Sequence, residues 1–231
     1  MRNARSFVCL LCVLALAFTA AAQMGAPVQI PNIFGLWSPE VGSGSAYEIQ
    51  DKDGTKKQFE MTVIGREEVN GKPGFWMEIG MTNPKTNGPV YIKYLMAPGQ
   101  TETSAVLFKM IMMMPGQPQP IEIDMNSGPM AAAMAGRAGA SAPKDIRDKG
   151  EMVGTETITV PGGTFSCQHW RAKDGTGDVW VSSKVGPWGL VKMQGKDSAV
   201  ILTRLITDAK DHITGTPISM QQMMQQMGRR Q

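Results

Sequence analysis

The residues that decide the fold run from Gly154 to Arg171 and read GTETITVPGGTFSCQHWR. Threonine, isoleucine and valine are concentrated before Pro161, and a second run rich in threonine and aromatic residues follows Gly163. β-branched and aromatic residues favour strands, whereas Pro-Gly-Gly favours a tight turn. The stretch therefore predicts two antiparallel strands, 152–160 and 164–172, joined by a turn.

Short strand-like runs separated by Gly, Pro, Asn and Asp continue in both directions from this stretch. Asp53-Gly54 and Asn70-Gly71 are typical of tight hairpin turns, because glycine accepts positive φ angles. The connections are too short for crossover helices, so neighbouring strands are expected to be antiparallel. The further predicted strands are 45–50, 55–65, 74–82, 89–96, 103–113, 120–125, 178–183, 190–194 and 198–207. We predict a mainly β fold, a curved antiparallel sheet or partly open half-barrel, in one domain spanning 23–217.

Two segments interrupt the strand pattern. Residues 126–146 are rich in Met, Ala and Gly and predict an inserted segment that is flexible or helical, since glycine weakens helices. Residues 218–231 are rich in Met and Gln, and four methionines share one helix face at i, i+3, i+4 and i+7: Met220, Met223, Met224 and Met227. We expect a short C-terminal helix or tail whose methionine face docks on the sheet. The alternatives are contact with a membrane surface and disorder.

Residues 1–22 have the pattern of a secretory signal peptide. Arg2 and Arg5 precede an uncharged apolar run of about a dozen residues, which ends in small residues. A membrane-spanning helix needs about 20 apolar residues. We therefore predict cleavage after Ala22, no transmembrane span afterwards, and a periplasmic or secreted protein.

Cysteine and charge limit the fold and its partners. Cys9 and Cys12 lie inside the predicted signal peptide, so cleavage leaves only Cys167 and no intramolecular disulfide. The full chain carries a formal net charge of +3, and removing Arg2 and Arg5 leaves a charge close to zero. We therefore expect no nucleic-acid partner.

The sequence lacks an obvious catalytic arrangement. It has two histidines, His169 and His212, without the spacing of a zinc site, and no nucleophile elbow, Walker loop or dinucleotide fingerprint. Cys167 and His169 are two residues apart on a predicted strand, which places both side chains on one face about 6 to 7 Å apart. No third orienting group is visible, so we predict a semi-buried thiol beside a sheet histidine, not a nucleophile and base. The protein is predicted to be no enzyme and to need no cofactor.

Methionine is unusually frequent, with 19 in the chain. Thioethers bind Cu(I), so the four C-terminal methionines are the candidate metal ligands if the protein handles copper. Methionine also adapts to irregular apolar partners, which is the interpretation we favour. The candidate lining of an apolar ligand cavity is Trp76, Trp170, Trp180, Met112 and Met114, although the same residues could simply fill a core.

The stretch from Gly154 to Arg171, together with GDVWVS at 177–182 and VGPWGLVK at 185–192, resembles a group of uncharacterised bacterial envelope proteins. These share a strand–turn–strand of the type E-x-I-x-V-P-A/G-G-T-F, a D-V-W-V-S strand and a P-x-G-L-V-K return. They are similar in pattern to the lipoprotein-carrier superfamily typified by LolA and LolB. The resemblance covers residues 154–207 and implies a half-barrel that holds acyl chains.

Three functional hypotheses follow. The first is an exported protein that binds or carries an apolar, lipid-like ligand. The second is a structural or protein-interaction module whose partner is another envelope protein. The third is copper handling by the methionine clusters.

Overall fold

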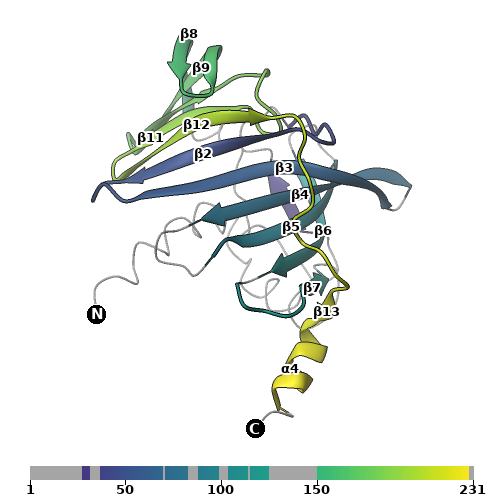
Figure 1. Cartoon of the computed structure of the whole chain (residues 1–231). Coiled ribbons are helices and arrows are strands. Elements are labelled where there is room, and N and C mark those ends of the chain that lie inside the picture. The colour runs from purple at the N-terminus through teal and green to yellow at the C-terminus, as the bar shows by residue number, and fades with distance from the viewer. Residues whose placement is uncertain are drawn as a thin grey trace.

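A computed structural model of the chain (Figure 1) describes residues 28–31, 37–69, 71–82, 88–98, 104–113, 115–124 and 150–228. The predicted signal peptide, the predicted insertion at 126–146 and Met114 lie outside these residues. Within the described residues, no helix combines the length and the apolar character that crossing a membrane requires.

The described strands form one open sheet, which confirms the predicted mainly β fold (Figure 1). Their order is β13-β7-β6-β5-β4-β3-β2-β12-β11-β10-β9-β8, and β1 pairs with β6 beside this path. The strands are β1 (Val28–Pro31), β2 (Gly44–Asp51), β3 (Lys56–Val69), β4 (Lys72–Thr82), β5 (Val90–Pro98), β6 (Ser104–Met113), β7 (Ile121–Asp124), β8 (Gly150–Val160), β9 (Gly163–Ala172), β10 (Gly177–Val181), β11 (Leu190–Gly195), β12 (Ser198–Ile206) and β13 (Ile218–Ser219). All neighbours are antiparallel except β13 and β7, which are parallel.

The predicted hairpin of the deciding stretch is formed by β8 and β9, with Ile158 opposite Phe165. Gly163 has a φ of 138°, a conformation that favours glycine. The turn also lies against β12, because the Gly162 N–H donates to the carbonyl of Leu202 at 3.1 Å. A Cβ on Gly162 would lie 2.8 Å from Leu202 Cγ, so the close approach excludes a side chain there.

The sheet between β3 and β7 has two chemically different faces. Alternate residues of a strand point to opposite faces, and paired residues of antiparallel strands share a face. The apolar face consists of Phe59, Met61, Val63, Phe75, Met77, Ile79, Met81, Ile92, Tyr94, Met96, Met110, Met112, Ile121 and Ile123. The polar face includes Glu60, Thr62, Trp76, Glu78, Tyr91, Lys93, Lys109 and Glu122.

Residues 207–217, which we call the strap, follow β12 and cross the polar face to the far end of the sheet (Figure 1). The strap is held near its start by a hydrogen bond from Ala209 N to Gly42 O, and just beyond its end by one from Ile218 N to Pro120 O, both at 2.9 Å. It leads into β13 and then into the helix α4 (Met220–Gly228). The strap therefore ties β12 to β7, which is far from it in the sheet.

Helix α4 lies within the predicted C-terminal segment. Ser219 and Gln222 form a reciprocal cap, in which Gln222 N donates to Ser219 Oγ at 3.2 Å and Ser219 N donates to Gln222 Oε1 at 2.9 Å. Met223 is half-buried and packs against the core, as expected for a helix that docks on its own sheet.

Candidate functional site

The apolar face is the candidate functional site, because it is a broad surface built from adaptable side chains. Val63, Met77 and Met96 are buried, each with at most 2% of its surface exposed. Six of its side chains are only partly buried: Phe59, Phe75, Met81, Ile92, Met110 and Met112. Six of its members are methionines, whose flexible thioethers fit irregular apolar shapes.

Aromatic rings and a cation meet at one end of the apolar face. The Trp37 ring meets the Phe75 ring edge to face at 5.9 Å between centroids, and Trp188 stacks on Trp37 at 6.0 Å. The Arg66 guanidinium carbon lies 5.2 Å from the centroid of the same Phe75 ring. Trp37 Nε1 is buried, and no described residue provides it with a hydrogen-bond acceptor. Trp37 and Arg66 could not be predicted as site residues from the sequence, because Trp37 precedes β2 and no spacing pattern links it to Phe75.

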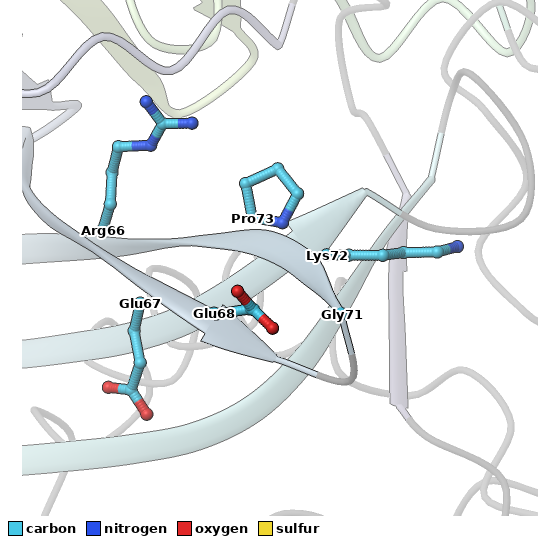
Figure 2. Close-up of a pocket in the computed structure, with 6 residues that line it drawn as sticks. All are labelled: Arg66, Glu67, Glu68, Gly71, Lys72 and Pro73. Atoms are coloured by element: carbon cyan, nitrogen blue, oxygen red, sulfur yellow. The ribbon is translucent and has the colours of Figure 1, made fainter.

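A shallow depression of about 410 Å³ lies beside this end, at the β3–β4 hairpin (Figure 2). It is open to solvent and is lined by Arg66, Glu67, Glu68, Gly71, Lys72 and Pro73. Figure 2 shows that Arg66 and Glu67 extend from opposite sides of the hairpin, as their alternation on β3 requires. Arg66 is therefore turned towards the side of the sheet that carries Phe75.

On the polar face, the carboxylate of Glu78 fastens the strap. Glu78 is 1% exposed, and its oxygens lie 2.6 Å from His212 Nδ1 and 3.1 Å from His212 N. Burial raises the pKa of Glu78, and the hydrogen bonds and charge of His212 oppose that rise only in part. The His212 ring stacks on Tyr91, and Lys93 pairs with Asp211 at 2.5 Å. These contacts hold a segment in place and leave no room for a substrate at the carboxylate.

The structure confirms that Cys167 and His169 share one face, where both are buried. His169 Nε2 lies 2.7 Å from Asp178 Oδ1 and its Nδ1 lies 3.0 Å from Glu156 Oε1. Both ring nitrogens are thus occupied by carboxylates. Burial, with a contribution from the negative charge of Glu156, raises the pKa of the Cys167 thiol to about 11. The thiol is fully buried, not semi-buried as predicted, and is not activated as a nucleophile.

The same ionic cluster shifts the pKa of Asp178. Burial alone would raise it, but hydrogen bonds from His169 and Arg171 and their charges outweigh that effect and lower the pKa. The cluster joins β8, β9 and β10 through Glu156, His169 and Asp178. In the part of the chain that the structure describes, no three His, Cys, Asp or Glu side chains gather as a metal site would require.

The structure does not bring the predicted cavity residues together. Met112 lies on the apolar face, and Trp170 is half-buried beside β10. Trp76 lies on the polar face, where its Nε1 donates to Glu67 at 3.0 Å. Trp180 stacks on His169 at 4.4 Å within the ionic cluster. The physical reason is strand alternation, which turns Trp76 away from its neighbours on the apolar face.

Of the four C-terminal methionines, the structure describes the side chain of Met223 alone, and that side chain packs against the core. The side chains of Met220, Met224 and Met227 are outside the described set. A copper site on this helix therefore stays a prediction.

By its fold and its apolar face, the chain is a protein built on one open sheet with an apolar side. No protein-family profile and no curated protein matches the chain. A candidate lipoprotein from Parabacteroides distasonis is similar over 74% of this chain and 97% of its own, with 16% identity and a TM-score of 0.38. A candidate exported protein with a YmcC-like fold from Bacteroides fragilis is similar over 74% of this chain and 98% of its own, with 12% identity and a TM-score of 0.36. Similarity at this level assigns no function.

Proposed function

We propose that the protein is an exported binding protein that holds a lipid-like ligand against its apolar face. The observation that carries the proposal is the uninterrupted apolar surface across β3 to β7, rich in methionine and aromatic residues. The strap covers part of the opposite face, and the partly buried side chains of the apolar face are those that a ligand would contact first. The signal-like pattern of residues 1–22 supports export.

The energetics favour such a ligand. Transferring an acyl chain of about 15 methylenes from water gives roughly 12 kcal/mol, at about 0.8 kcal/mol for each methylene. Association costs about 4 to 15 kcal/mol in lost translational and rotational freedom, a range that spans this gain, so a long and well-packed chain is needed to offset the cost. The partly buried Phe75, Ile92 and Met110 provide contact points that a chain reaches without unfolding the sheet.

Native mass spectrometry of mature protein from a bacterial envelope fraction tests the proposal, followed by organic extraction of bound molecules. We expect reproducible adducts in the lipid mass range. Two variants on β6 provide a matched pair, because Met110 faces the apolar side and Met113 the polar side. Met110→Gln should lower the retained lipid several-fold and Met113→Gln should not. A bare mass in several preparations, together with equal behaviour of the two variants, would contradict the proposal.

A second candidate function is protein interaction through β8, which is the terminal strand at its end of the described sheet. Its residues Met152 and Val153 are each 49% exposed, unusual for large apolar side chains beside an open strand edge. An envelope protein that adds a strand to β8 would cover them. Val153→Lys should then abolish capture of that partner in a pull-down without changing the melting temperature, and unchanged capture would argue against this function.

A further inference from the structure

We propose that β8 pairs with β8 of a second copy of the chain, antiparallel about a two-fold axis at Thr157, so that two open sheets join into one. This inference rests on the second candidate function, strand addition at β8, and names its partner. It is independent of the ligand proposed for the apolar face.

The two ends of the described sheet differ in how their edges are protected. At one end the outer strands are very short, four residues in β7 and two in β13, and helix α4 follows β13 directly. At the other end β8 has 11 residues, and β9 is its only hydrogen-bonded neighbour among the described strands. Short edge strands resist pairing with another chain, whereas a long one is a template for it. Figure 1 shows the β8–β9 hairpin at the end of the molecule away from α4.

The backbone of β8 presents three residues to a partner strand. Val160 and Gly163 flank the two-residue turn, so they form a hydrogen-bonded pair, and such pairs alternate with non-hydrogen-bonded ones along the hairpin. Thr159, Thr157 and Thr155 therefore direct their N–H and C=O groups away from β9. The side chains of all three are exposed, and neither proline nor lysine interrupts this part of the strand.

An axis at Thr157 gives a register in which β8 is complementary to itself. Thr157 then lies opposite the same residue of the second copy, and Thr155 lies opposite Thr159. All three residues that direct their backbone groups outwards are therefore paired. Threonines in opposite positions of neighbouring strands also stabilise a sheet. The pairing uses the long edge of each copy, so association stops at a dimer.

Charge and apolar surface also match in this register. Glu156 lies opposite Ile158 of the second copy, so no two carboxylates meet in opposite positions. The Glu156 carboxylate is paired with His169 of its own chain at 3.0 Å. Val153, which is 49% exposed, comes to lie beside the turn that follows β8 in the second copy. The dimer therefore accounts for an apolar side chain that the single chain leaves in water.

Analytical ultracentrifugation of the mature protein over a range of concentrations tests the dimer, and we expect a monomer–dimer equilibrium. Thr157→Lys places two ammonium groups opposite each other at the axis and should raise the dissociation constant at least about tenfold. Ser166→Lys is the matched control, because Ser166 is exposed and lies opposite Thr157 on β9, one strand inside the edge. It should change the dissociation constant by less than about twofold, since salt screens the more distant charges. Circular dichroism and the melting temperature check that both variants fold.

Cysteine cross-linking tests the register without introducing a charge. The Cα atoms of a hydrogen-bonded antiparallel pair lie about 5.5 Å apart, a separation that a disulfide can span. Thr157→Cys should therefore form a disulfide-linked dimer on mild oxidation, and Ser166→Cys should not. The natural Cys167 is buried and does not compete.

The possible failures are distinguishable. A monomer at every concentration, or a dimer that Thr157→Lys and Ser166→Lys affect equally, overturns the pairing of β8 with itself. Equal cross-linking of Thr157→Cys and Ser166→Cys overturns the register at Thr157. If the protein is monomeric but Thr157→Lys abolishes capture of another envelope protein, strand addition at β8 stands with that partner and the dimer is overturned. If Thr157→Lys changes neither self-association nor capture, the second candidate function fails and the dimer with it.

Discussion

Replacing His212 with alanine tests whether Glu78 holds the strap to the sheet. In the wild type the buried carboxylate is contacted by the ring at 2.6 Å and by the backbone N–H at 3.1 Å. The substitution removes the first contact and the stacking of the ring on Tyr91, whose centroid lies 4.6 Å away. It leaves a carboxylate that is 1% exposed with one of these two donors.

The expected cost follows from these contacts. A hydrogen bond to a charged group contributes about 1.5 to 3 kcal/mol, and an aromatic stack about 0.5 to 1.5 kcal/mol. The His212 side chain is 46% exposed, so water replaces part of what is lost. We therefore expect the free energy of unfolding at neutral pH to fall by about 2 kcal/mol. Lys210→Ala, an exposed change in the same strap, should cost less than about 0.5 kcal/mol.

Urea unfolding followed by tryptophan fluorescence measures these differences. A double-mutant cycle with Glu78→Gln isolates the pair, because removing the charge should make His212→Ala cheaper by about 1 kcal/mol. If His212→Ala costs the same in both backgrounds, or no more than Lys210→Ala, the pair does not hold the strap and our reasoning is refuted.

Three other predictions concern the rest of the sheet. Because the pKa of Asp178 is lowered in the folded protein, its ionised form stabilises the fold above about pH 4. In urea unfolding, Asp178→Asn should therefore lower the free energy of unfolding at neutral pH, and this loss should vanish as the pH falls through the lowered pKa. A loss that stays constant with pH would contradict the prediction. Cys167 is buried, and its thiol has a pKa of about 11. At pH 8 it should therefore react with an aromatic disulfide reagent at least about 100-fold more slowly in the native protein than in urea. A rapid reaction in the native protein would contradict the burial. Gly162→Ala should lower the free energy of unfolding by about 1 to 3 kcal/mol, because the added Cβ clashes with Leu202. Gly65→Ala should lower it less, because its added Cβ lies 3.8 Å from the nearest atom. Equal losses for the two variants would contradict the close packing of Gly162 on Leu202.

Most strands could be predicted because their signals are local. The predicted strand 164–172 corresponds to β9 (Gly163–Ala172), and 198–207 corresponds to β12 (Ser198–Ile206). Gly54 and Gly71, chosen for their tolerance of positive φ, have φ angles of 79° and 74°. Alternation and turn-forming residues are properties of neighbouring positions, so they can be recognised without knowledge of the tertiary contacts.

Long-range contacts could not be predicted in this way. Glu78 and His212 are separated by 134 positions, and nothing in either local sequence points to the other. The pairing of β13 with β7 and that of β1 with β6 are similarly remote. β6 and β7 were predicted, as strands 103–113 and 120–125, but their short partners β1 and β13 were not.

The apolar character of the candidate site could be predicted from the sequence, but the set of residues that form it could not. The excess of methionine predicted adaptable apolar packing or ligand contact, and Met112 lies on the apolar face with five other methionines. Trp76 was grouped with it for its size alone, although the alternation of Phe75, Trp76 and Met77 already separates the tryptophan from its neighbours. Arg66 escaped notice because its contact with the apolar row depends on a cross-strand pairing.

The pairing of β13 with β7 also has a consequence for biosynthesis and turnover. β7 is synthesised long before Ile218, so its outer edge stays unpaired until the last part of the chain has been made. An unpaired strand edge is a template for aggregation. A protease that removes residues after the strap would leave most hydrogen bonds of the sheet intact but would uncover this edge. Damage at the C-terminus is therefore expected to appear first as insoluble protein, before any loss of β structure.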